Sequence, residues 1–264
     1  MNVNYAYFLD YIKLLPKKRG DFRVLDFGCG NGEIVELLRE SGIDCFGVEV
    51  FYEGANYSIK DDDLYKAGII KPIDEIGDLP FPERYFDVII SNQVFEHVRD
   101  MQHSISRLDR ILKNDGLMYL HFPTLDTVNE GHIGIPLAHC LRKDSKFRYY
   151  YTLALRCLGL GYFKGDKSPA QWTKDQLQWI DTYCFYRSLG DIKTILASKY
   201  RVRHNELQYI RFRCAKNRLI SFISRIEPLS GFYQRVFRRT AFVALELRRI
   251  RPSLITGRSP QVQG

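Results

Sequence analysis

A carboxylate placed directly before three glycines is the feature of this sequence that most clearly points to chemistry. Residues 24–34 read VLDFGCGNGEI, so Asp26 precedes Gly28, Gly30 and Gly32. Most turns between a strand and a helix bind phosphate, and dinucleotide sites use the spacing G-x-G-x-x-G. Here the spacing is G-x-G-x-G, and a phosphate about 4 Å from Asp26 would cost on the order of 4 kcal/mol. The turn is therefore predicted to hold a positively charged ligand.

Further polar residues suit a nucleoside as that ligand. Glu49 ends a predicted strand, where a carboxylate accepts hydrogen bonds from both hydroxyls of a ribose, in a dinucleotide or a nucleoside alike. Asp74 ends a weaker strand and is expected to accept a hydrogen bond from adenine. S-adenosylmethionine carries an ammonium and a sulfonium and so fits Asp26 better than NAD does. The plainer alternative is that Gly32 only begins a helix and Asp26 caps its first turn.

Alternating strand and helix signals surround these residues. Helices are expected after the glycine turn, at 100–113 and at 187–199, and strands at 23–27, 44–50, 69–74, 85–91, 117–122, 201–212 and 240–247. This alternation predicts a doubly wound α/β fold: a mostly parallel, seven-stranded, Rossmann-like sheet with an antiparallel last strand and an insertion after strand five.

The alternation of strands and helices holds in some parts of the chain and not in others, which divides the chain into parts. Residues 123 to about 180 contain no sustained strand and are expected to form loops and short helices. The predicted parts are an N-terminal helix at 1–21, the cofactor-binding core at 22–123, a substrate-covering insertion at 124–186, the rest of the core at 187–250 with a basic amphipathic insertion at 216–239, and a disordered tail at 251–264.

Four motifs in order resemble the class I S-adenosylmethionine-dependent methyltransferases. They are VLDFGCGNG, GVEV, LPFPERYFDVIISNQVFEHV and LDRILKNDGLMYLHFP, within about residues 22–123, and the likeness is greatest to the ubiquinone-biosynthesis type, in the methyltransferase type 11 branch. IDEIGDLPFP is one residue longer than usual there, which leaves Asp78 as an alternative to Asp74. The resemblance implies S-adenosylmethionine as cofactor, with Asp26, Gly28, Gly30, Gly32, Glu49 and Asp74 as its binding residues. Asn92, in the polar S-N-Q turn, is also predicted to bind it.

The residues on the acceptor side favour transfer to oxygen. Methyl transfer from a sulfonium mainly needs orientation, but a hydroxyl acceptor also benefits from a base such as histidine. Amine-methylating enzymes of this fold often carry N-P-P-Y where this chain has Ser91 to Val94, so N-methylation is disfavoured. No set of three carboxylates for a magnesium site is found, and no metal is expected.

Histidines of the insertion are the candidate bases. In EGHIGIPLAH, His132 is the first choice and His139 the second, although either could instead bond loop backbone. His97, in the Glu96–His97 pair, is the third, and it could instead hold a helix start. His121 is equally suited to face the cofactor or the core.

Aromatic residues near the end of the insertion have two interpretations. Trp172 and Trp179 lie seven residues apart and are expected to pack in the core on one helix face. With Tyr183, Tyr186 and Arg187 they could instead stack on a sugar or hold an anionic group.

Composition sets the broad class of the protein. With 264 residues, 45% of them hydrophobic and 27% charged, the chain suits one large α/β domain or one with an insertion. No apolar stretch is long enough to span a membrane and no secretion signal is recognised. The six cysteines form no C-x-x-C pair, so reduced thiols in a cytoplasmic protein are expected, without a disulfide framework or a zinc site.

The net charge of +8 is uneven, since fifteen basic and three acidic residues follow from Lys199 onward. Segment 216–239 is amphipathic and basic, which fits peripheral contact with an anionic membrane at its inner face, or equally a sheet-edge cover or a dimer contact. Nucleic acid is not expected as a partner, and the oligomeric state is not predicted.

Three functions follow from these features. The first is O-methylation of a small molecule, a sugar or a lipid-linked glycan. The second is a methyltransferase-like module without catalysis that binds S-adenosylmethionine and docks on a membrane or a partner protein. The third, a nicotinamide-dependent oxidoreductase, is disfavoured by the glycine spacing and by Asp26.

Overall fold

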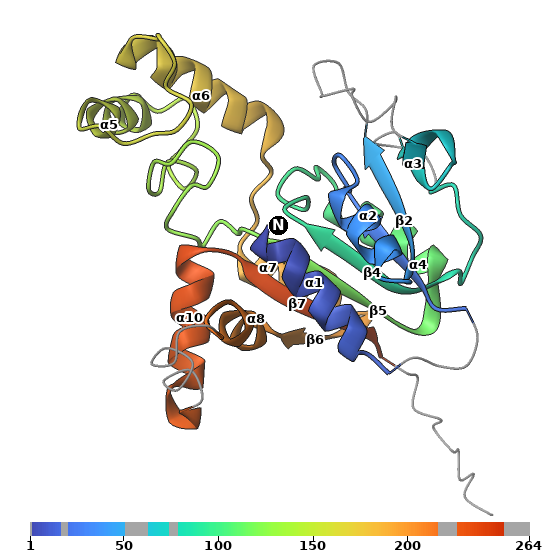
Figure 1. Ribbon diagram of the computed structural model, residues 1–264. Coiled ribbons are helices and arrows are strands. Elements are labelled where there is room, and N and C mark those ends of the chain that lie inside the picture. Colours follow the sequence, from blue (N-terminus) through green and yellow to red (C-terminus); the bar gives the residue numbers. More distant parts are fainter. Residues whose placement is uncertain (1, 17–20, 51–62, 74–78, 216–225, 251–264) are drawn as a thin grey trace, which may run out of the picture.

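A single seven-stranded sheet runs through the protein (Figure 1). The computed structural model describes residues 2–16, 21–50, 63–73, 79–215 and 226–250. The strands are β1 Arg23–Phe27, β2 Asp44–Val50, β3 Ile70–Ile73, β4 Phe86–Asn92, β5 Leu112–Phe122, β6 Tyr200–His204 and β7 Val243–Arg249. Two residues and two segments that bear on the predictions lie outside the described residues: Asp74, Asp78, residues 216–225 and the tail 251–264.

The strand order is β3-β2-β1-β4-β5-β7-β6. Strands β1 to β5 pair in parallel, and β7 is antiparallel to both of its neighbours. The chain therefore reverses its direction of travel across the sheet between β1 and β4, and ligands of such sheets bind outside the strand ends at that point. The predicted fold class, with its antiparallel last strand, is confirmed.

Side chains alternate between two apolar layers along each central strand. Val24, Val88 and Tyr119 pack on one face with the helices α1 Val3–Leu14, α2 Glu33–Glu40 and α8 Glu206–Arg213. Leu25 and Ile89 pack on the other face, with α4 Met101–Ile111 and α7 Leu189–Ala197. Because successive side chains of a strand point to opposite faces, a sheet covered on both sides is apolar throughout.

The insertion after β5 forms a smaller unit to one side of the sheet (Figure 1). It contains α5 Lys146–Cys157 and α6 Pro169–Tyr183, of 12 and 15 residues, which are longer than the short helices predicted. Ser168 begins α6 by accepting a hydrogen bond from the Gln171 backbone, with Pro169 at the first turn. Trp172 is fully buried between the helices, as predicted, with Ile133 and Ile180 beside it.

The prediction of a strand at 201–212 is wrong beyond its first residues. The strand β6 ends at His204, and α8 begins at Glu206. The cause is tertiary: the buried Glu206 carboxylate accepts a hydrogen bond from the Ala244 backbone and pairs with His204 at 3.0 Å.

Smaller elements complete the described chain. The last strand begins at Val243 rather than at 240, and the 3₁₀ turn η2 Glu227–Leu229 precedes α10 Ser230–Thr240, which packs on α8. The short helix α3 Asp63–Lys66 lies before β3. Among the residues described, every helix is too short or too polar to cross a lipid bilayer.

Candidate active site

The glycine turn after β1 needs glycine for two separate reasons. Gly28, Gly30 and Gly32 have φ of 78°, 53° and 81°, in the left-handed region that other residues rarely adopt. A Cβ on Gly28 would lie 2.3 Å from Val94 Cγ2, and one on Gly32 would lie 2.5 Å from Ile70 Cδ1. Among the described residues, nothing lies within 4 Å of a Cβ added to Gly30, so its backbone is open to a ligand.

Asp26 provides the charge at this turn. Its side chain is 1% exposed, and neither carboxylate oxygen has a hydrogen-bond partner among the residues that the structure describes. Burial, and then the nearby Glu49, raise the pKa of Asp26 to about 8. It does not cap the next helix, because Gly32 is the N-cap of α2 and no side chain caps it. An unpaired buried carboxylate fits a ligand that brings a positive charge or donors.

Glu49 lies beside the open glycine. Its Oε2 accepts a hydrogen bond of 2.6 Å from the Gly30 backbone, and its Oε1 accepts one of 2.8 Å from the Val50 backbone. Burial raises the pKa of Glu49, and these two N–H donors offset part of that rise. The end of β2 and the glycine turn therefore form one polar corner, which suits the ribose role predicted for Glu49.

The N-terminal helix reaches the same corner, a contact not predicted from the sequence. Asn4 donates to Asn92 Oδ1 at 3.1 Å, and its own oxygen accepts a hydrogen bond of 2.6 Å from the Tyr209 hydroxyl. Burial, hydrogen bonding to Glu33 and the charges of Glu33 and Asp26 raise the pKa of Tyr5 to about 12. Asn4 and Tyr5 had no local sequence signal, because they meet the turn only through the packing of α1.

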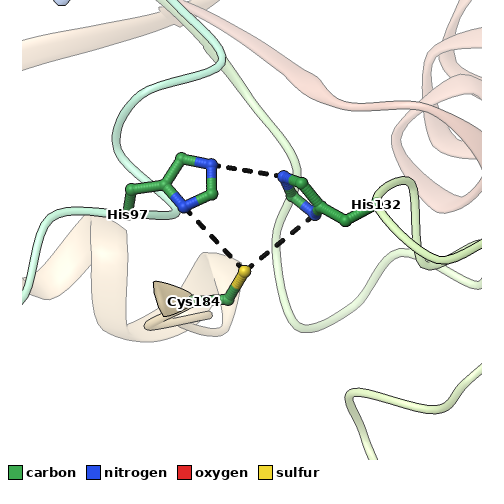
Figure 2. Close-up of side chains that lie close together, drawn as sticks. All are labelled: His97, His132 and Cys184. Carbon is green, nitrogen blue, oxygen red and sulfur yellow. Dashed lines mark hydrogen bonds between the residues drawn. The ribbon is translucent and has the colours of Figure 1, made fainter. Parts of the chain in front are cut away.

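Two of the three predicted histidine bases are in contact (Figure 2). The Nε2 atoms of His97 and His132 are 3.2 Å apart. His97 follows β4, whereas His132 and the nearby Cys184 belong to the insertion and its end. Burial, and then the neighbouring His132, lower the pKa of His97, although a hydrogen bond with the Tyr183 carbonyl acts in the opposite direction.

Glu130 orients His132. Its Oε1 lies 2.8 Å from His132 Nδ1 and accepts from the Tyr186 hydroxyl, while its Oε2 accepts from the backbones of His132 and Ile133. Burial alone would raise the pKa of Glu130, but these hydrogen bonds outweigh it and lower the pKa below its ordinary value. Glu130 is therefore an ionised acceptor, and a buried Glu–His pair of this kind is a common arrangement for a base.

Aromatic residues border this pair. The Trp179 ring centroid is 5.2 Å from that of His132 and 6.1 Å from that of His97, and the residue is 37% exposed. The prediction that both tryptophans pack in the core is therefore wrong for Trp179, whose neighbour Ile180 packs in the small core with Trp172 instead. Arg187 donates instead to main-chain oxygens, such as those of Phe185 and Val98.

The remaining candidates lie around the pair or away from it. His139 lies beside Tyr186, with ring centroids 4.7 Å apart, and burial lowers its pKa. Glu96 is buried with neither oxygen bonded to any described residue, and burial raises its pKa to about 8. His121 packs among aromatic rings such as Tyr7, on the face of α1, and burial lowers its pKa to about 3. His121 thus faces the core.

Comparison with known proteins identifies the family. A family model described as a methyltransferase domain matches residues 2–225. The chain belongs to this methyltransferase family. The prediction that the chain is a class I S-adenosylmethionine-dependent methyltransferase is confirmed at the level of the family. The cofactor of this family is S-adenosylmethionine.

Curated relatives match only part of the chain. A 27-O-demethylrifamycin SV methyltransferase of Amycolatopsis mediterranei is 30% identical, over 40% of this chain and 40% of its own. A ubiquinone biosynthesis O-methyltransferase of Bartonella quintana is 28% identical over 44% and 46%. A malonyl-[acyl-carrier protein] O-methyltransferase of Coxiella burnetii is 30% identical over 50% and 42%. The chain thus spans less than half the length of these relatives.

A solved structure supports the fold of this methyltransferase. An S-adenosylmethionine-dependent methyltransferase from Mesorhizobium loti superposes with a TM-score of 0.53 at 14% identity, covering 94% of this chain and all of that one. At that identity the likeness shows the shared fold alone.

Proposed function

We propose that this protein methylates a hydroxyl group of a small molecule, a sugar or a lipid-linked glycan. The observation that carries the proposal is the Glu130–His132 pair, with Nδ1 of His132 2.8 Å from the buried carboxylate. Because Glu130 accepts a hydrogen bond from the Nδ1–H group, the neutral ring keeps an unprotonated Nε2. A base needs such an unprotonated nitrogen. His132 is therefore the proposed base, with His97 and His139 as the neighbouring candidates.

The cofactor is proposed to lie at the glycine turn. S-adenosylmethionine supplies a methyl group that its sulfonium has already activated. Asp26 meets its positive charge, Gly28, Gly30 and Gly32 let the backbone approach, and Glu49 accepts from the ribose. Asn92 and Asn4 close the corner. Asp74 stays the proposed adenine partner and lies outside the described residues.

Transfer to oxygen is supported by the names of three relatives: two are called O-methyltransferases and the third names an oxygen position. The insertion is the proposed cover over the acceptor, since it supplies His132, Glu130 and the partly exposed Trp179. An aromatic ring beside a base suits a sugar or an aromatic acceptor.

Contact with an anionic membrane through 216–239 is a separate proposal. In the described half of that segment, Phe232 is 63% and Val236 42% exposed, one helical turn apart, and Arg235 and Arg239 are exposed as well. An apolar pair beside arginines suits the surface of an anionic bilayer. Sedimentation with anionic but not neutral vesicles supports this contact, and Phe232→Ser is expected to weaken it; a concentration-dependent dimer instead supports a contact between copies.

One experiment tests the function. S-adenosylmethionine binding is measured by calorimetry, and labelled cofactor is used to find methylated products in cell extract. Gly28→Ala is expected to weaken binding by at least about 100-fold, which is about 2.7 kcal/mol, since the added Cβ meets Val94. Gly131→Ala, at a glycine with open space around it, is the control and should bind normally.

The outcomes separate the alternatives. His132→Asn is expected to bind the cofactor and lose turnover. Cofactor binding with no methylated product from any extract would support a methyltransferase-like module without catalysis. Binding of NAD in place of S-adenosylmethionine would reject the proposal.

A further inference from the structure

The two facing histidines present their unprotonated nitrogens to each other. Nδ1 of His97 lies 2.8 Å from the carbonyl oxygen of Tyr183, and Nδ1 of His132 lies 2.8 Å from Glu130 Oε1. The Tyr183 carbonyl and the Glu130 carboxylate only accept hydrogen bonds. The Tyr186 hydroxyl, which also lies 2.8 Å from His132 Nδ1, donates its single proton to Glu130 and so accepts from the ring as well. Each neutral ring therefore carries its proton on Nδ1.

As a consequence, the Nε2 lone pairs of His97 and His132 point toward each other. The Nε2 atoms are 3.2 Å apart (Figure 2). Two lone pairs at this distance repel, unless a proton or a cation lies between them. The side chain of His132 is 23% exposed, so an ion can reach the pair from solvent.

A sulfur atom completes a set of three ligands. Cys184 Sγ lies beside the same two rings, and one ligand atom from each of the three residues falls within 4.8 Å of the others. Cys184 is a buried free cysteine. Imidazole nitrogen with thiolate sulfur is a ligand set for zinc and related transition metals, whereas magnesium prefers oxygen.

The surroundings resemble those of metal-binding histidines. Such histidines almost always donate their second N–H to a carboxylate or a main-chain carbonyl, and here His132 and His97 do so to Glu130 and Tyr183. Charge also balances, because a divalent ion would neutralise the Glu130 carboxylate and a Cys184 thiolate together.

We propose that His97, His132 and Cys184 bind a divalent transition-metal ion, zinc in the first place, with a fourth position left for water or a substrate oxygen. Three protein ligands and one open position are typical of zinc sites that take part in chemistry. This proposal reverses the sequence prediction of no metal and no zinc site. The three ligands come from segments 35 and 52 residues apart, so no spacing motif joins them.

A catalytic role for the metal ion rests on the proposed function, whereas binding of the ion does not. With an ion bound, both Nε2 atoms are occupied and His132 is no longer a free base. A hydroxyl at the open position would then release its proton to water, because the ion lowers the pKa of the oxygen bound to it.

The test is a cobalt titration of the full chain after dialysis against a chelator. We expect one equivalent of Co²⁺ to bind, with the visible absorption of a tetrahedral site and a near-ultraviolet thiolate-to-cobalt band, and Zn²⁺ to displace it. Cys184→Ser should abolish the thiolate band, whereas Cys157→Ser, at an exposed cysteine of the same insertion, should keep it.

Further variants measure the other ligands. His97→Asn and His132→Asn should each weaken Co²⁺ binding by at least about 100-fold, more than the roughly 10- to 100-fold expected from Glu130→Gln, which loses only an orienting partner. His103→Asn, at an exposed histidine of α4, should bind normally. Circular dichroism and melting of the metal-free variants show whether each has folded.

Two results would overturn the proposal: absence of stoichiometric cobalt binding, or a thiolate band that survives Cys184→Ser. In the first case the histidine pair shares a proton instead. The titration uses neither cofactor nor acceptor, so it stands apart from the proposed function. Methyl transfer without cobalt binding rejects the metal site alone, and cobalt binding without methyl transfer rejects the function alone.

Discussion

Asp26 and Glu130 are both 1% exposed carboxylates, yet their surroundings are opposite. Asp26 has no hydrogen-bond partner among the described residues, and its pKa is raised to about 8. Glu130 accepts hydrogen bonds from two side chains and two backbone N–H groups, and its pKa is lowered. The first lies at the bare glycine turn and the second in the insertion.

The difference indicates how each half of the site works. A carboxylate without donors destabilises the ligand-free fold and gains most from a cationic ligand, so the cofactor half is complete only when occupied. A carboxylate with its donors already in place fixes the orientation of His132. The acceptor half is therefore oriented before any ligand binds. Four experiments can break or sharpen this contrast.

The largest effect is expected in the pH dependence of stability without ligand. Below the ordinary Asp26 pKa of 3.8 the carboxyl is protonated in both folded and unfolded states, so it costs nothing. As pH rises, the unfolded state ionises first, and stability falls until the folded pKa of about 8 is passed. The loss is at most about 6 kcal/mol.

Urea unfolding of the wild type and of Asp26→Asn between about pH 4 and 9 measures that loss. The substituted protein should lack the part of the slope that belongs to Asp26, while Glu96 contributes equally to both proteins. Parallel stability curves would mean that Asp26 is paired in solution and would remove the contrast.

The next largest effect is expected from Glu130→Gln. Its amide can no longer accept from all the donors that now surround the carboxylate, so His132 loses its orientation. Turnover should fall by about 100-fold or more, with cofactor affinity unchanged. Steady-state kinetics and calorimetry measure the two quantities. Asp166→Asn, at an exposed acid of the same insertion, is the control; equal turnover in the two variants would contradict the orienting role.

A smaller effect is expected on cofactor affinity from Asp26→Asn. The substitution keeps the shape and removes the charge, and so should weaken S-adenosylmethionine binding by about 10-fold, or 1.4 kcal/mol. Asp21→Asn, at an exposed acid before β1, should bind like the wild type. Unchanged affinity in Asp26→Asn would show that the backbone of the turn, and not the charge, selects the ligand.

The smallest effect is expected from Tyr186→Phe. This change removes one of the donors to Glu130 and leaves the other three, so stability should fall by about 0.5–1.5 kcal/mol. Thermal or urea unfolding measures it, and Tyr150→Phe, at a residue that is 63% exposed, should be neutral. A loss of stability as large as that measured in the same way for Glu130→Gln would mean that the tyrosine, not the backbone, holds the carboxylate.

The two halves also differ in how far the sequence predicts them. Asp26 and the three glycines lie within seven consecutive residues, where the strand–turn–helix geometry is local and its chemistry follows from the spacing. His97 and His132 are 35 residues apart and meet only after the insertion has folded. The sequence could therefore nominate each histidine but not their contact, and it gave Cys184 no role.

Secondary structure shows the same limit. The parallel strands were predictable because a run such as YFDVIIS is apolar on both faces. The turn from β6 into α8 was not, because it depends on Glu206 being buried against the Ala244 backbone of a strand nearly forty residues later. Residues whose conformation is fixed by distant partners carry no periodic signal.

The side chain of Asn4 has a practical consequence. It joins the end of β4 to α8 through Asn92 and Tyr209, so the first helical turn is tied to the rim of the proposed cofactor site. A bulky affinity tag fused directly ahead of this turn would strain both hydrogen bonds at once. Recombinant protein for ligand measurements is therefore best tagged at its other end, beyond β7.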